Sequence, residues 1–194
     1  YRNLSQDDKS WVADGAIVME NGYVYDDALV KDTAIVTGAA RIYSSARVLD
    51  EATVGGDADI GDKAIIENNA HVDGHSKITD DVIVRDHAIV TGESYLAYMV
   101  RVGGHARVID SGLTYGANIG GKSLIRNCTL RGNRTFGDCE LTNVRTSATY
   151  THITNSTITC GVRLPDYDDI FNANIRHEHD YFISPYFFAY NDKD

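Results

Sequence analysis

Residues 28–60 read ALVKDTAIVTGAARIYSSARVLDEATVGGDADI, and one six-residue pattern runs through them without a break. An aliphatic residue recurs at every sixth position, as at Val30, Val36, Ile42, Val48 and Val54. A period of six matches neither the 3.6-residue period of an α-helix nor the two-residue alternation of an ordinary strand. It is typical of a hexapeptide β-solenoid, in which three six-residue sides complete one triangular coil.

The series extends in both directions from this stretch, from Val12 to Thr114, and only Thr114 is not apolar. In most hexads the residue two positions earlier is alanine, as at Ala28 and Ala34. Side chains alternate along a strand, so the alanine and the aliphatic residue should both point inward. Alanine fits near a corner, where a triangular interior leaves little room. We therefore predict an all-β fold, a triangular parallel β-solenoid.

The residue two positions after each buried aliphatic is mostly Asp, Gly or Asn, which tolerate left-handed backbone and cap turns. Residues eighteen apart should stack, which puts one column of glycines at one corner: Gly38, Gly56, Gly74 and Gly92. The other two corners carry acids: Asp14, Asp32, Asp50 and Asp86 on one, Asp26, Asp62 and Asp80 on the other. We expect each carboxylate to cap its own turn. The alternative is that the stacked carboxylates bind calcium.

The repeat divides the chain into a regular and an irregular part. Regular hexads cover 12–114 within a solenoid that we expect to span 12–162. In 115–162 the inward series continues at shorter spacing: Ile125, Leu130, Phe136, Leu141, Ile153 and Ile158, with Cys128, Cys139 and Cys160 at small inward positions. Residues 1–11 are expected to cap one end. Residues 163–194 are expected to form a C-terminal cap or the start of a truncated region, because open solenoid ends need cover.

Composition excludes several classes of function. The 194 residues suit one domain, and the net charge of −10 argues against a nucleic-acid partner. The chain has no apolar run of membrane-spanning length and opens with no signal peptide. Three cysteines, an odd number, predict no disulfide framework and a cytoplasmic location.

The outward residues fall into three columns, and one of them is conspicuously apolar. The first column holds Trp11, Leu29, Ile65 and Ile83, interrupted by arginines at 47 and 101, and the third runs from Tyr23 to Leu113. An exposed apolar ridge of this kind predicts self-association through the first face. The alternative is that isolated β-branched residues merely suit the surface of a sheet.

Three small groups of residues are candidates for binding or chemistry. His87 and His105 are eighteen apart and should stack about 5 Å apart at one corner. There they would act as a general base, bind a shared metal, or serve as solvated turn residues. A weaker metal candidate is the pair His177 and His179. The third group is a protrusion at a corner, Tyr95, Tyr98 and Met99, which we expect to contact a cap, a partner or a ligand.

The repeated six-residue motif, as in Ala88-Ile-Val-Thr-Gly-Glu, resembles the repeat of the hexapeptide-repeat superfamily of left-handed parallel β-helices. The resemblance is firm over 12–114 and loose over 115–162. It is most similar to YdcK-type β-solenoids of bacteria and phages, for which a transferase activity is commonly suggested. The resemblance implies the left-handed winding. Better-known members are trimeric acyltransferases that bind acyl-CoA between prisms and use a histidine base. The γ-carbonic anhydrases, metal-bound hydratases, share the fold.

This chain departs from both enzyme families. No loop interrupts the hexads, no acyltransferase histidine motif aligns, and the spacing of His71, His75, His87 and His105 differs from the carbonic anhydrase pattern. Our first hypothesis is therefore a non-catalytic structural or binding solenoid without a cofactor. It would form a homo-oligomer, with a trimer favoured, or bind a protein or carbohydrate. The alternatives are an acetyl-CoA-dependent acyltransferase with His87 or His105 as base and, more weakly, a metal-bound hydratase.

Overall fold

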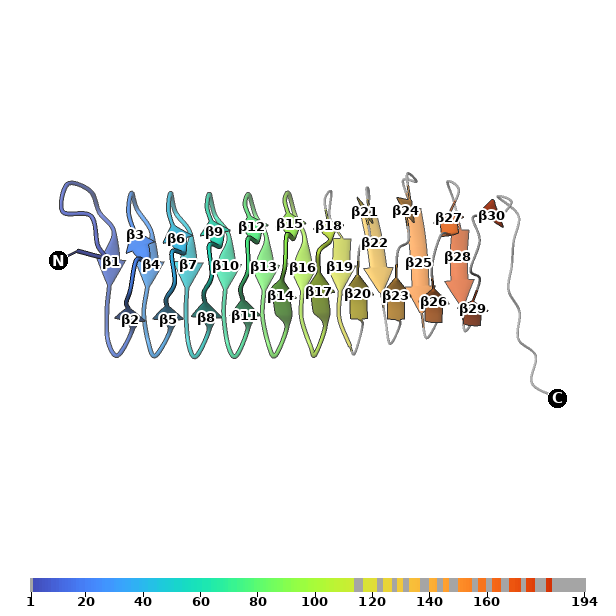
Figure 1. Cartoon of the computed structure of the whole chain (residues 1–194), viewed down its shortest axis with the longest axis horizontal. Coiled ribbons are helices and arrows are strands. Elements are labelled where there is room, and N and C mark those ends of the chain that lie inside the picture. The colour runs from blue at the N-terminus through green and yellow to red at the C-terminus, as the bar shows by residue number, and fades with distance from the viewer. Residues whose placement is uncertain are drawn as a thin grey trace.

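In the computed structural model the chain winds into a triangular β-solenoid whose three faces are parallel ten-stranded sheets (Figure 1). The structure describes residues 2–113 and 117–121 in full, and beyond residue 121 it describes the backbone of strands β20 to β30. Every regular element in these residues is a strand. The predicted fold class is confirmed.

Each coil contributes one strand to each sheet, so every third strand along the chain belongs to the same face. The first sheet contains β1 (Trp11–Val12), β4 (Leu29–Val30), β7 (Arg47–Val48), β10 (Ile65–Ile66), β13 (Ile83–Val84), β16 (Arg101–Val102), β19 (Ala117–Ile119), β22 (Asn133–Phe136), β25 (Tyr150–Thr154) and β28 (Asp168–Phe171). The second contains β2 (Ile17–Val18), β5 (Ile35–Val36), β8 (Thr53–Val54), β11 (His71–Val72), β14 (Ile89–Thr91), β17 (Arg107–Ile109), β20 (Leu124–Arg126), β23 (Glu140–Thr142), β26 (Thr157–Thr159) and β29 (Asn174–Arg176). The third contains β3 (Tyr23–Val24), β6 (Arg41–Ile42), β9 (Asp59–Ile60), β12 (Lys77–Ile78), β15 (Tyr95–Leu96), β18 (Gly112–Leu113), β21 (Thr129–Leu130), β24 (Arg145–Thr146), β27 (Val162–Leu164) and β30 (Tyr181–Phe182).

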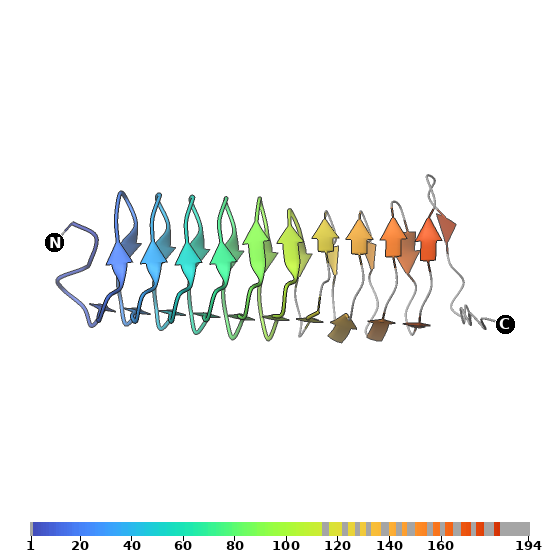
Figure 2. The same cartoon turned by 90° about the horizontal axis from the view of Figure 1, so that it is seen from below.

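Successive coils stack in a strict eighteen-residue register through the regular part of the chain (Figure 2). Ile65 pairs with Ile83, and the Ile65 N–H donates to the Val82 carbonyl at 2.9 Å. The same bond recurs on each face, so the backbone groups that the two-residue strands direct at the next coil are satisfied without long strands.

The interior is filled by the two inward series that the sequence predicts. Val36 and Val54 are fully buried, as are the alanines that precede them by two residues. On the third sheet Ile42, Ile60 and Ile78 stack directly on one another and are also fully buried. Full burial of such a side chain contributes roughly 1.5–3 kcal/mol, so each buried aliphatic column contributes substantially to stability.

The glycine corner confirms the predicted vertical registry. Gly38, Gly56, Gly74 and Gly92 all have positive φ, between 60° and 74°. A Cβ built on Gly56 would lie 2.6 Å from the Gly74 carbonyl oxygen and 2.6 Å from an Asp73 carboxylate oxygen. This corner therefore needs glycine for close approach of successive coils as well as for its backbone conformation.

The acidic corners differ from the expectation that each aspartate caps its own turn. The carboxylate of Asp32 accepts the N–H of Asp50 at 3.2 Å, and that of Asp50 accepts the N–H of Asn68 at 2.9 Å. Asp26 and Asp62 do the same for Ser44 and Asp80 in the next coil. At positive φ the N–H of a corner residue points toward the preceding coil, where the earlier carboxylate lies. Each of these four aspartates therefore caps the coil that follows it.

The offset between paired residues shortens from eighteen to seventeen before the hexad series ends. Tyr95 pairs with Gly112 and Leu96 with Leu113, and Leu113 is fully buried. The placement of Leu113 in the third outward column was wrong, because the coil before it has seventeen residues and this moves Leu113 inward. Thr114 lies outside the described residues.

Beyond residue 121 the strands remain paired, but the offset between partners varies from sixteen residues, as for Leu124 and Glu140, to nineteen, as for Val162 and Tyr181. Val108 pairs with Ile125 and Leu113 with Leu130, so two predicted inward residues align with buried ones. Three strands, β28, β29 and β30, fall within 163–194, the segment expected to be a cap or the start of a further region. Cys128, Cys139 and Cys160 lie outside the described residues.

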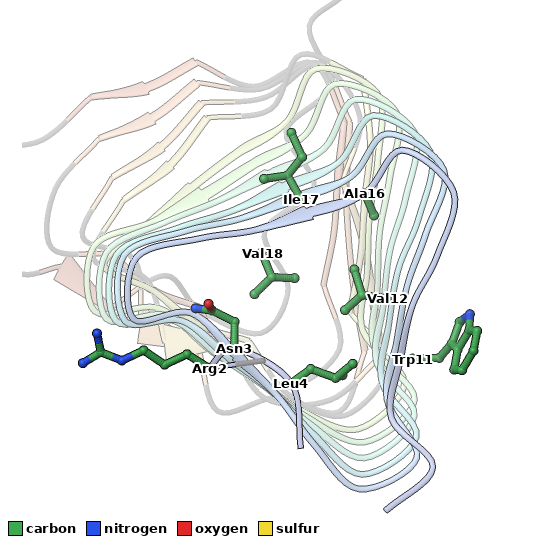
Figure 3. A pocket seen from close by; sticks show the side chains of 8 residues that line it. All are labelled: Arg2, Asn3, Leu4, Trp11, Val12, Ala16, Ile17 and Val18. Atoms are coloured by element: carbon green, nitrogen blue, oxygen red, sulfur yellow. The ribbon is translucent and has the colours of Figure 1, made fainter. Parts of the chain in front are cut away.

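At the N-terminal end, a short loop completes the first coil. Leu4 forms a bridge to Val24, and the Asn3 side-chain amide donates to the carbonyls of Glu20 and Gly22 at 3.0 and 2.8 Å. Leu4 packs against the core together with Val12 and Val18. These residues border an open apolar pocket of about 480 Å³ at the end of the solenoid, while Trp11 points away from the interior (Figure 3).

Asp8 begins the series of corner carboxylates. Its Oδ2 accepts the N–H of Asp26 at 2.6 Å, and its Oδ1 accepts the N–H and the hydroxyl of Ser10. Partial desolvation alone would raise the pKa of Asp8. These hydrogen bonds and one from Ser5 outweigh it and lower the pKa to about 2.

Candidate functional site

The outer face of the first sheet presents the apolar ridge in the predicted order. Trp11 pairs with Leu29, Leu29 with Arg47, Arg47 with Ile65, and Ile65 with Ile83. Trp11 is 63% exposed, whereas Leu29, Ile65 and Ile83 are half-buried by their neighbours within the chain. Trp11 is thus the most exposed large apolar side chain among the described residues of this face, and such exposure favours burial against a partner.

A second exposed apolar group lies farther along the solenoid, at Tyr95, Tyr98 and Met99. The exposed fractions are 43%, 45% and 59%. Tyr98 occupies a corner where most other coils have a small residue, with φ of 61°, and its N–H donates to the Asp80 carboxylate at 3.0 Å. The corner is therefore built like its neighbours, but a tyrosine and a methionine project from it.

The two candidate catalytic histidines are brought together as their spacing predicts. The rings of His87 and His105 stack with centroids 4.9 Å apart and an interplanar angle of 28°. Both are exposed at the corner between the first and second sheets. Next to them the Asp86 carboxylate accepts the N–H of Gly104 at 2.7 Å, so this acid is engaged in capping the coil.

No group of three or more metal-ligating side chains occurs within the described residues. His177 and His179, the second metal candidate, lie outside the part of the chain that the structure describes. The corner carboxylates proposed for calcium mostly accept backbone N–H groups in the described coils.

Two further clusters had not been singled out from the sequence. On the second sheet, Thr53 Oγ1 lies 2.5 Å from His71 Nδ1, and His71 Nε2 lies 3.8 Å from the Asp73 carboxylate. At the neighbouring corner, His75 Nε2 lies 2.9 Å from the Asp57 carboxylate. Thr53 and His71, and likewise Asp57 and His75, are eighteen residues apart, so the stacking rule used for His87 would have found them.

On the third sheet, Arg41 forms a two-pronged ion pair with Asp59 at 2.6 and 2.9 Å. This pairing raises the pKa of Arg41, which keeps the guanidinium charged. Beside it the rings of Tyr25 and Tyr43 stack at 5.4 Å, and burial raises the pKa of both phenols. Gly61 lies under Tyr43, where any Cβ would overlap the ring. Within this cluster the charges of Arg41 and Asp59 are therefore paired with each other.

Comparison with known proteins gives no relative, since neither a protein-family model nor a curated protein matches the chain. Within the residues that the structure describes, no helix has the length and apolar character needed to cross a membrane.

Proposed function

We propose that the protein is a structural, non-catalytic β-solenoid that associates with other copies through the outer face of its first sheet. The observation that carries this proposal is the apolar ridge of that sheet, in particular Trp11, which is 63% exposed. Covering Leu29, Ile65 and Ile83 would stabilise the association by about 25 cal/mol for each Å² of apolar surface removed from water.

The rigidity of the scaffold supports the same proposal. Coils stack through backbone bonds near 2.9 Å, and corner carboxylates connect one coil to the next. A surface on such a scaffold loses little conformational entropy when it docks, which favours a binding role for flat faces. The resemblance to hexapeptide-repeat proteins adds the proposals of left-handed winding and a bacterial or phage source.

Serine substitution of matched isoleucines tests the proposal. Ile83 on the first sheet and Ile89 on the second lie in the same coil at the same position of their strands, and both are half-buried. Light scattering after size exclusion should give a multiple of 21.3 kDa for the wild-type chain. Ile83→Ser should shift the distribution toward the monomer, and Ile89→Ser should not. A wild-type chain that is monomeric at every concentration contradicts the proposal.

One observation favours a second function, acyl transfer from acetyl-CoA. It is the exposed stack of His87 and His105, at a corner that borders the first sheet. If copies associate through that sheet, the corner would line the groove between them, where an acyltransferase would need its general base. Acetyl-CoA binding would then raise the melting temperature of the wild-type protein, because a ligand that binds only the folded state stabilises it.

A further inference from the structure

The face of the first sheet carries an ordered pattern of charge around its apolar ridge. Three columns are defined here: a central column formed by the first residue of each strand, a leading column two residues before it, and a trailing column two residues after it. Over the first six strands, the three columns hold six basic residues, Lys9, Lys31, Arg47, Lys63, Arg85 and Arg101, and three acidic residues, Asp27, Glu67 and Asp81. The face is thus positive on a chain with a net charge of −10.

Within this pattern each coil that is charged on both sides carries opposite charges on its two flanks. In the coil of β4 the leading residue is Asp27 and the trailing residue is Lys31. The coil of β10 reverses the order, with Lys63 leading and Glu67 trailing. The coil of β13 again has an acid leading, Asp81, and a base, Arg85, trailing.

Most of these charges form no ion pair among the residues that the structure describes. Lys31 and Arg85 lie 3.4 and 3.9 Å from the corner carboxylates of Asp32 and Asp86, in exposed pairs of the kind that contribute little. Asp27, Lys63, Glu67 and Asp81 make no ion pair with any residue in the described part of the chain. They are available to a partner.

We propose that a second copy of this chain docks on the face in parallel, about a two-fold axis that runs along the solenoid. This inference rests on the proposed self-association and specifies its geometry. Under that symmetry each coil meets the same coil of its partner, and the central columns meet each other. Each leading column then faces the partner's trailing column. Asp27 meets Lys31, Lys63 meets Glu67, and Asp81 meets Arg85, each pair occurring twice.

The reverse orientation fits less well when these six coils overlap. If two copies ran antiparallel in that register, each leading column would meet the partner's leading column in reverse order of coils. Asp27 would then face Asp81, and Lys31 would face Arg85. Like charges placed opposite each other are destabilising, so the pattern favours the parallel arrangement over this antiparallel register. Arg47 and Arg101 of the central column each meet their own copy, so the parallel arrangement has two like-charged contacts against six contacts between opposite charges.

The six strands that carry the charge pattern set the size of the contact. At about 4.8 Å per strand and about 13 Å from leading to trailing column, these six strands cover on the order of 400 Å² on each copy. A dimer would bury about twice that area, which is the size of a weak interface.

Two charge variants test the geometry. The positive variant combines Asp27→Lys with Asp81→Lys, and the negative variant combines Lys31→Asp with Arg85→Asp. Each variant alone opposes like charges across the interface in two coils. Mixed, they restore opposite charges in both substituted coils, because the leading column of one variant then faces the trailing column of the other. The control Glu51→Lys with Glu93→Lys makes the same charge change as the positive variant, on the second and third sheets.

Native mass spectrometry and sedimentation give the readout, since the two variants differ in mass. The wild-type chain and the control should be dimeric. Each charge variant should have a dissociation constant at least tenfold higher than wild type, and the mixture should form mainly heterodimers. Circular dichroism verifies that each exposed variant is folded. Charge variants that dimerise like the wild type would overturn the parallel geometry but not the proposed self-association. A wild-type mass of three copies would have the same consequence. A monomeric wild-type chain overturns both proposals.

Discussion

Asp50 has two separable roles at its corner, which three substitutions can resolve. Its φ of 59° lies in the left-handed region, which Asp, Asn and Gly tolerate better than other residues. Its Oδ2 accepts hydrogen bonds from both the N–H and the side-chain amide of Asn68, each at 2.9 Å. The N–H of Asp50 itself donates to Asp32, and all three variants keep that bond.

The expected effects follow from these two roles. A hydrogen bond to a charged group contributes roughly 1.5–3 kcal/mol, but Asp50 is exposed and water replaces part of it, so we take about 1 kcal/mol. A left-handed alanine adds about 1 kcal/mol, the low end of its usual cost. Asp50→Ala should therefore lower the free energy of unfolding by about 2 kcal/mol, and Asp50→Gly by about 1 kcal/mol. Asp50→Asn keeps an acceptor oxygen and the backbone preference, and should lie within about 0.5 kcal/mol of wild type.

Urea unfolding gives the ranking, and hydrogen exchange locates the lost bond. In Asp50→Gly the amide of Asn68, one coil later, should exchange faster, while that of Glu51 in the same turn should not. If Asp50→Ala is as stable as Asp50→Asn, or if protection is lost in its own turn, the capping of one coil by the previous one is refuted.

Four further outcomes are expected. The pKa of Asp8 is lowered from 3.8 to about 2, so its carboxylate stabilises the fold above pH 4 and this stability is lost as the pH falls toward 2. The melting temperature, measured from pH 5 to pH 2, should therefore depend less on pH in Asp8→Asn than in the wild-type chain. Gly56→Ala should be more destabilising than Ser44→Ala in chemical unfolding, because both corners have positive φ but only Gly56 meets a neighbouring backbone at 2.6 Å. Leu113→Ala should lower the free energy of unfolding by about 2–5 kcal/mol in the same measurement, whereas a decrease under about 0.5 kcal/mol would show that this side chain is exposed rather than buried. Millimolar acetyl-CoA should leave the melting temperature unchanged if the protein is structural, and a concentration-dependent rise would favour the acyltransferase alternative.

The fold could be predicted because one period sets both burial and stacking. Val36 and Val54 are buried for the same reason that Gly38 and Gly56 align, since residues eighteen apart occupy the same place in successive coils. The stack of His87 and His105 follows from the same rule. Their chemical role does not, because stacking depends on backbone register and catalysis depends on a substrate.

Two features could not be obtained from the period. The shift that buries Leu113 depends on one coil having seventeen residues, and a six-residue template passes over a single missing residue when the neighbouring position is also acceptable. The direction of capping by Asp32 and Asp50 depends on which way an N–H points at positive φ, which composition does not encode. The opposite charges of Asp27 and Lys31 are visible in the sequence, but they acquire meaning only once both are placed on one face.

The direction of capping makes the two ends of the solenoid unequal. A chain cut between coils would leave the N-terminal piece with its corner amides still bonded to earlier carboxylates, and its last carboxylates simply hydrated. The C-terminal piece would begin with corner amides whose acceptors had been removed, as the N–H of Asn68 would be without Asp50. At these corners, shortening from the C-terminus therefore leaves the caps of the remaining coils in place, whereas shortening from the N-terminus removes the caps of the new first coil each time.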